Sequence, residues 1–255
     1  MIRKLILAII ITCMMPAISI AEVIVAVTSN FYLPLIEIRN NYTKITGSNI
    51  IVISGSTGKL YTQITQGASF DIFLAADDVR PKLLEKNNFA TNNSRFTYAI
   101  GKLVFWSPGN ENFKSSREYL EKDTDNYIVI ANPKLAPYGK AAESVLNKMG
   151  LTSKYSNKIV TAENVNQAFM YIDKKQVNKG FISLSQILQK QTGIEGENKL
   201  FWIVPDKYHD PILQQAVLLK KAKPNQEAMD FYNYLKSDAA VSLIQGYGYH
   251  TVKNS

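Results

Sequence analysis

Small hydroxyl and amide side chains gather where predicted strands give way to predicted helices. The first junction is Thr28-Ser29-Asn30-Phe31, the second is Ser54-Gly55-Ser56-Thr57-Gly58, and the third runs from Asn132-Pro133 to Ala136-Pro137-Tyr138-Gly139. A helix N-terminus offers backbone N–H groups without intrahelical partners and the positive end of the helix dipole. With the hydroxyls of Ser29, Ser56 and Thr57 as further donors, these junctions predict an anion site that needs no Lys or Arg.

Two other interpretations of the junctions stay open. Ser, Thr and Asn at helix starts are commonly N-caps, which is the simpler explanation of any one junction alone. An exported serine hydrolase that uses Ser56 or Ser29 with His209 is the second alternative. The segment Ser54–Gly58 matches neither the G-x-S-x-G nucleophile elbow nor the P-loop, because the required spacing and the Lys-Ser/Thr ending are missing.

The composition narrows the classes of function. The chain has a single cysteine, Cys13, and two histidines, His209 and His250, so neither thiolate nor histidine-rich metal spacing is present in the sequence and no cofactor is expected. The formal net charge of +8 fits steering of an anionic ligand as well as simple solubility. The Lys residues are scattered and form no dense basic stripe with aromatics, which argues against nucleic-acid binding.

The N-terminus has the pattern of a secretory signal peptide. Arg3 and Lys4 precede an apolar run, and Ser19-Ile20-Ala21 supplies the small residues that a signal peptidase reads. The run is too short for a bilayer-spanning helix, which needs about 20 apolar residues. We therefore predict cleavage after Ala21 and a periplasmic location; lipidation at Cys13 is the weaker alternative, because Thr12 stands where a small residue is usual.

Short β-branched runs alternate with helical patterns and predict an α/β fold. Val23–Val27, Asn49–Ile53 and Asp71–Ala75 carry apolar residues on both faces, as central parallel strands do. Helical spacing from Phe31 to Ile45 predicts an apolar helix face closed by Gly47. Ala99–Trp106 has the pattern of one long strand. Two long segments, near 96–107 and 209–221, are candidates for crossovers between two lobes.

The chain resembles the periplasmic molybdate-binding proteins of ABC transporters, in particular the branch that carries a Tyr in the site. The resemblance covers essentially the whole chain after the signal peptide, and the number and order of its motifs make it specific. The matching segments are Val27–Phe31, Ser54–Tyr61, Gln63–Ala68, Asp71–Asp77, Phe96–Val104, Asn132–Gly139, Gly180–Gln186 and Pro211–Val217.

The resemblance implies a two-lobed, type II periplasmic binding protein fold with a ligand cleft between the lobes. The chain then divides into the signal peptide 1–21, lobe 1 at 22–100, lobe 2 at 101–211 and a return segment at 212–255. The implied ligand-binding residues are Ser29, Asn30, Ser56, Thr57, Tyr138 and Val165, the last through its backbone N–H. Thr57 stands where Ser is more common, and Ser183 stands where another branch has a ligand Tyr, so that contact is not carried over.

The implied ligand is molybdate or tungstate, delivered by a monomeric, non-enzymatic binding protein to an ABC permease. Molybdate is fully deprotonated at neutral pH and only accepts hydrogen bonds, so a pocket lined by donors suits it. Protonated phosphate would bring a donor that faces donors. Sulfate, phosphate and thiosulfate remain alternative ligands of the same fold, because the sequence does not give the size of the cavity.

Overall fold

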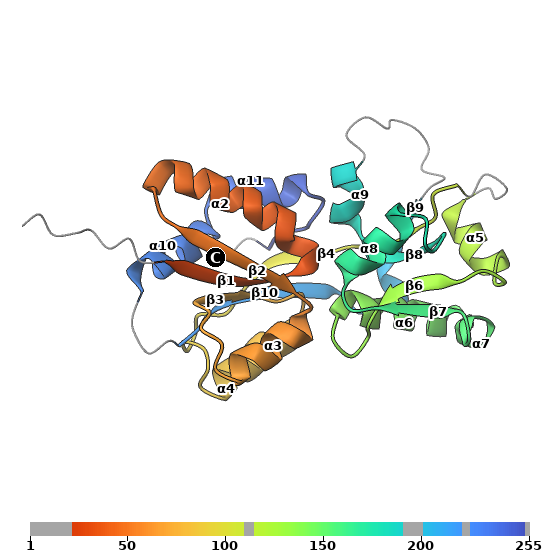
Figure 1. Cartoon of the computed structure of the whole chain (residues 1–255), viewed down its shortest axis with the longest axis horizontal. Helices are drawn as coiled ribbons and strands as arrows, with labels where there is room; N and C mark the ends of the chain where they lie inside the picture. Colours follow the sequence, from red (N-terminus) through yellow and green to blue (C-terminus); the bar gives the residue numbers. More distant parts are fainter. Residues whose placement is uncertain (1–21, 110–114, 191–200, 221–224, 253–255) are drawn as a thin grey trace, which may run out of the picture.

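The computed structural model describes residues 22–109, 115–190, 201–220 and 225–252, and the predicted signal peptide with Cys13 lies outside them. The chain forms two lobes, each built on a five-stranded mixed sheet with helices on its faces (Figure 1). This is the α/β, two-lobed architecture that the sequence predicted. No helix in the described part of the chain combines the length and apolarity that crossing a membrane requires.

Lobe 1 contains the sheet with strand order β2-β1-β3-β10-β4. The strands β1, β2 and β3 are parallel, as expected, and β10 runs antiparallel to β3 and β4. The strands are β1 (Val23–Thr28), β2 (Ile50–Gly55), β3 (Ile72–Leu74), β4 (Phe96–Gly101) and β10 (Ile212–Leu218). The helices are η1 (Ser29–Phe31), α2 (Tyr32–Thr46), α3 (Thr57–Thr65), α4 (Val79–Lys86), α10 (Gln226–Tyr234) and α11 (Asp238–Gly246).

Lobe 2 contains the sheet with strand order β7-β6-β8-β5-β9. Its strands are β5 (Leu103–Trp106), β6 (Ile128–Ala131), β7 (Ile159–Ala162), β8 (Gly180–Ser183) and β9 (Phe201–Ile203). Its helices are α5 (Ser116–Lys122), α6 (Pro137–Lys148), α7 (Thr152–Tyr155), α8 (Val165–Asp173), α9 (Leu184–Lys190) and η2 (Asp206–Tyr208).

Both faces of the lobe 1 sheet are covered, and the strand sequences show why. Val25 packs with residues of α2, α10 and α11, whereas its neighbour Ala26 packs with residues of α3 and α4. Successive side chains of a strand point to opposite faces, so an apolar residue at every position requires helices on both sides. The helix after β1 ends as expected at Gly47, which has a φ of 75°. The assignment of Ile45 to the apolar face was wrong, because this side chain is 75% exposed in the last turn.

The chain crosses between the lobes at two places. The prediction of one long strand over Ala99–Trp106 was wrong: β4 ends at Gly101 in lobe 1 and β5 begins at Leu103 in lobe 2. Both strands are largely buried, so the apolar run continues through the crossing and the pattern does not mark the change of sheet. The return crossing lies between β9 of lobe 2 and β10 of lobe 1.

Gly101 lies at the first crossing, where the backbone approaches two buried side chains from opposite lobes. A Cβ atom at this position would collide with the Tyr138 hydroxyl and would lie 2.7 Å from Gln214 Nε2. The crossing therefore needs a residue without a side chain so that the lobes can meet.

We expect Gly101→Ala to lower the free energy of unfolding by about 1–3 kcal/mol, the usual cost of overpacking a filled interior. Urea denaturation of the variant measures this change. Gly246→Ala is the matched control: a Cβ there meets open space at the end of α11, so it should stabilise by roughly 0.5–1 kcal/mol. Equal stability of Gly101→Ala and the wild type would contradict the close approach.

Candidate functional site

The three junctions lie between the two lobes and are largely hidden from solvent. Asn30, Ser56, Thr57, Tyr138 and Val165 are each at most 2% exposed. Ser29, the first residue of η1, is half-buried. The helix η1 of lobe 1 contacts α8 and α9 of lobe 2, which places the first junction against the second lobe.

Hydrogen bonds between the lobes join the junction loops. The Gly58 N–H at the start of α3 donates to the Leu135 carbonyl at 2.8 Å. The Ser185 hydroxyl of α9 donates to the Asn30 carbonyl at 3.2 Å. The Gly58 bond joins the starts of α3 and α6, and α8 packs against η1. The first turns of all three helices have N–H groups with no intrahelical partner.

Ser56 occupies the N-cap position of α3 but does not act as a cap. Its hydroxyl accepts no hydrogen bond from the helix, and its Oγ is buried without a partner among the described residues. Within the described residues, four other helices have an ordinary N-cap, in which a side-chain oxygen accepts an N–H group of the first turn; these caps are Ser115, Asn164, Asn225 and Ser237. Capping therefore does not explain Ser56, whose hydroxyl is free to bind a ligand.

The hydroxyl of Thr57 is engaged within lobe 1. Its Oγ1 accepts the Ala76 N–H at 3.2 Å and donates to the hydroxyl of Thr28 at 3.1 Å. Thr57 therefore fixes the start of α3 against the end of β3. It can donate to a ligand once this pair reverses and the Thr28 hydroxyl becomes the donor. The backbone N–H of Thr57, in the first turn of α3, has no intrahelical partner.

Asn30 and Tyr138, from opposite lobes, meet at Gln214 of β10, a residue that the sequence analysis did not assign to the site. Gln214 Oε1 accepts from Asn30 Nδ2 at 2.9 Å and from the Tyr98 hydroxyl at 3.0 Å. Its Nε2 donates to the Tyr138 hydroxyl at 3.2 Å. The Tyr138 phenol thus faces Gln214, and the N–H of Tyr138 lies in the first turn of α6, where no side chain caps the helix.

Tyr249 closes this cluster from the end of the chain. Its hydroxyl donates to the Asn30 carbonyl at 2.9 Å and accepts from Asn30 Nδ2 at 3.0 Å. Burial raises the pKa of Tyr98 and of Tyr138 well above the usual value and that of Tyr249 to about 12. All three phenols are therefore neutral near pH 7 and add no negative charge to the interface.

Val165 belongs to the same network through lobe 2. Its carbonyl accepts from Gln186 Nε2 at 3.4 Å, and Gln186 Oε1 accepts from the N–H and the hydroxyl of Ser183 at 3.1 and 3.0 Å. Ser183 Oγ lies 2.9 Å from Ser185 Oγ, which in turn reaches Asn30. Ser183, the position at which the resemblance implies a Tyr in another branch, is thus buried and bonds to other lobe 2 side chains.

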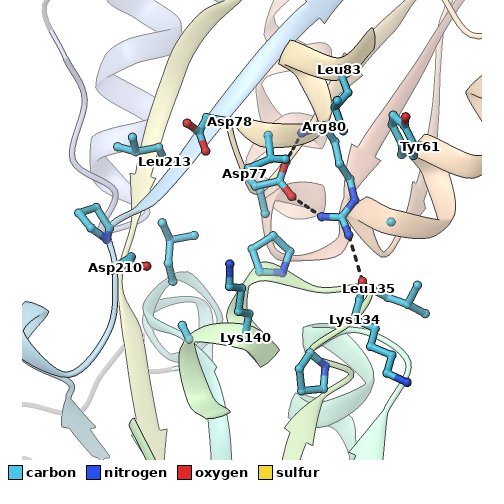
Figure 2. A pocket seen from close by; sticks show the side chains of 18 of the residues that line it. Tyr61, Asp77, Asp78, Arg80, Leu83, Lys134, Leu135, Lys140, Asp210 and Leu213 are labelled. Carbon is cyan, nitrogen blue, oxygen red and sulfur yellow. Dashed lines mark hydrogen bonds and ion pairs between the residues drawn. The ribbon is translucent and has the colours of Figure 1, made fainter. Parts of the chain in front are cut away.

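A cavity of about 740 Å³ opens between the lobes beside this network, and its lining is charged (Figure 2). It contains none of the six predicted site residues, although Gly58 and Pro137 line it. Arg80 bonds to Asp77 and donates to the Lys134 carbonyl at 3.0 Å, which joins the lobes. Burial raises the pKa of Asp77 against the opposing effect of Arg80. Arg80, Lys134 and Lys140 share the lining with the carboxylates Asp77, Asp78 and Asp210, so positive and negative side chains balance there.

His209 does not form a catalytic pair with either candidate serine. The ring is 2% exposed, Nδ1 donates to the Asp210 carbonyl at 2.7 Å, and Nε2 has no partner in the described ranges. Neither Ser29 nor Ser56 is hydrogen-bonded to it. Over the described residues, no three His, Cys, Asp or Glu side chains gather as metal ligands would.

Comparisons with known proteins give a matching family of solute-binding proteins and related molybdate-binding proteins. The sequence pattern of the family "Bacterial extracellular solute-binding protein" matches residues 23–250. The chain is 42% identical to the molybdate-binding protein ModA of Azotobacter vinelandii over 90% of each chain. It is 38% identical to ModA of Rhodobacter capsulatus over 96% of this chain and 94% of that one.

The solved structure of the periplasmic molybdate-binding protein of Azotobacter vinelandii superimposes with a TM-score of 0.84 at 36% identity, covering 90% of this chain and 99% of that one. The sulfate-binding protein SubI of Mycobacterium tuberculosis has a TM-score of 0.67 at 11% identity, covering 91% of this chain and 87% of that one, which shows the shared fold alone. The two-lobed architecture, the interface between the lobes and these matches together show that the chain belongs to the bacterial extracellular solute-binding proteins.

Proposed function

We propose that this protein captures molybdate or tungstate between its lobes and delivers the anion to an ABC permease. The observation that carries the proposal is the Ser56 hydroxyl, which is buried at the start of α3 without a partner. A buried hydroxyl without a hydrogen bond costs about 1–3 kcal/mol, so its retention indicates a partner that binds there. The molybdate-binding relatives, at 42% and 38% identity, support the choice of ligand.

The proposed ligand-binding residues are Ser29, Asn30, Ser56, Thr57, Tyr138 and Val165. The N-terminal N–H groups of α3, α6 and α8 supply donors and the positive ends of three helix dipoles. Because these donors are neutral groups with no proton to lose near pH 7, the site presents the same donors to the anion over the physiological pH range. A fully deprotonated oxyanion, which only accepts hydrogen bonds, is the ligand that such a set suits.

The cellular setting follows from the same proposal. The signal pattern of residues 1–21 and the periplasmic relative support export to the periplasm. The functional unit is proposed to be a monomer. The protein is proposed to be a carrier without catalytic activity, because the Ser-His pair that a hydrolase would need does not form. The residue composition of the site calls for no cofactor.

Molybdate and tungstate should bind with micromolar to nanomolar dissociation constants, about 8–12 kcal/mol of binding free energy. Calorimetric titration of residues 22–255 with molybdate, tungstate, sulfate and phosphate measures this. Phosphate should bind far more weakly, because its remaining proton would face hydrogen-bond donors. Sulfate should also bind far more weakly, because it is smaller than molybdate. Sulfate binding as tight as or tighter than molybdate binding would contradict the proposed choice of ligand.

Ser56→Ala should weaken molybdate binding by roughly 10- to 100-fold, because a hydrogen bond to a charged partner contributes about 1.5–3 kcal/mol. The ligand-free variant should unfold with a free energy higher by up to about 1–3 kcal/mol, since the hydroxyl caps nothing and its unpaired burial is relieved. Thr57→Ala should lose affinity and also stability, because the Ala76 N–H loses its acceptor, and Thr57→Ser is the control that keeps the hydroxyl. Unchanged affinity of folded Ser56→Ala, determined by calorimetry, would remove this residue from the site.

His209→Gln should leave oxyanion affinity within about twofold of the wild type, because neutral donors elsewhere hold the anion. Gln can still donate to the Asp210 carbonyl, so the fold should be kept. The same calorimetric titration tests this, with thermal unfolding as the check on folding. A tenfold loss of affinity in the folded variant would show that the imidazole is part of the site.

A further inference from the structure

Gln214 lies at the centre of the hydrogen-bond network that joins the two lobes. Its side chain is fully buried and bonds to Asn30, Tyr98 and Tyr138 at 2.9, 3.0 and 3.2 Å. Asn30 and Tyr138 belong to the proposed ligand site and come from different lobes. Gln214 is therefore placed to act on the anion through its neighbours, without touching it.

The direction of the hydrogen bonds leaves one atom of Asn30 unused. Asn30 Nδ2 donates both of its protons, to Gln214 Oε1 and to the Tyr249 hydroxyl. Asn30 Oδ1 is buried and has no partner within the described residues. An acceptor in this position opposes an anion that can only accept, so this direction of the network is unsuited to the bound state.

The same network can run in the opposite direction with one exchange: Tyr249 donates to Asn30 Oδ1 instead of to the Asn30 carbonyl, which keeps the Ser185 hydroxyl as its donor. If both amides turn over, Gln214 Nε2 donates to Asn30 Oδ1 and to the Tyr98 hydroxyl, and Tyr138 donates to Gln214 Oε1. The hydroxyls of Tyr98, Tyr138 and Tyr249 allow this exchange, because a phenol both donates and accepts. Tyr98 keeps its bond to the Ala75 carbonyl, observed at 3.0 Å. The unused atom of Asn30 then becomes Nδ2, a donor.

We propose that Gln214 is a positioning residue that sets the direction of the Asn30 amide, and that anion binding turns both amides over so that Asn30 Nδ2 faces the anion. This inference rests on the proposed function, since it needs an oxyanion in the interface. Gln214 would then also affect ligand selectivity. A ligand that carries a proton can donate a hydrogen bond, so it would favour the turned-over network less strongly than a fully deprotonated anion does.

Two replacements of Gln214 separate this role from packing. Gln214→Met keeps the size and has no preference for either amide direction, so molybdate binding should weaken about tenfold. Gln214→Glu keeps size and polarity but only accepts when ionised, which holds Asn30 Nδ2 and turns Oδ1 to the anion. Its binding should weaken about a hundredfold. A packing role alone predicts the reverse order, because Glu resembles Gln more closely.

The added charge of Glu is controlled in two ways. Gln215→Glu places a carboxylate one residue along β10, where the side chain bonds to Arg95 and Thr97 instead of Asn30, and it should leave affinity within about threefold. In the Asn30→Ala background, Gln214→Met and Gln214→Glu should differ by less than about threefold, because the amide that Gln214 directs is gone. Calorimetry with molybdate measures every variant.

Two results would overturn the inference: a milder effect of Glu than of Met in the wild-type background, or an unchanged gap between them in the Asn30→Ala background. If Gln214→Glu does not fold, Gln214→Met decides alone. The tenfold loss of molybdate affinity in Gln214→Met should shrink to about threefold or less when Asn30 is also replaced by Ala. An equal loss of affinity in both backgrounds would contradict the coupling between Gln214 and Asn30. Wild-type protein that binds no oxyanion would instead refute the proposed function.

Discussion

The interface between the lobes depends on one constraint: a buried polar group must find a partner. The two crossings bring strands and helix starts from both lobes into contact, and many buried polar side chains in that interface are hydrogen-bonded to one another. The buried side-chain atoms left without a partner in the described residues are Asn30 Oδ1, Ser56 Oγ, His209 Nε2 and Glu227 Oε2. Two of these four belong to the predicted ligand residues, so the unmet hydrogen bonds concentrate where the sequence placed the anion.

This constraint also explains why the proposed site consists of neutral groups. A cation enclosed between the lobes would need a permanent counter-charge, as the buried Lys179 does, whose ammonium pairs with Asp123 at 2.9 Å. Helix N–H groups and hydroxyls instead bind an anion without a counter-charge, because their dipoles are fixed by the fold. The charged side chains Arg80, Lys134 and Lys140 remain outside, around the adjacent cavity, where Arg80 holds the loop of lobe 2.

The sequence predicted the fold class, the central strands and the helix starts, because apolar runs and turn residues act locally. It also indicated the three junctions that meet between the lobes. It did not predict Gln214, Tyr249 or Ser185 as part of the site. Gln214 meets Asn30 across 184 residues of sequence, and Tyr249 meets it across 219. A polar residue within an apolar strand was a signal at Gln214, but its partners exist only once both crossings are made.

The central claim is that the anion lies among the neutral donors of the junctions and not among the cations of the adjacent cavity. The most direct measurement is anomalous X-ray diffraction at the molybdenum edge from crystals grown with molybdate. We expect one strong peak within hydrogen-bonding distance of the Ser56 hydroxyl and the N–H groups that begin α6 and α8. A peak beside Arg80 and Lys140, with none at Ser56, would contradict the account.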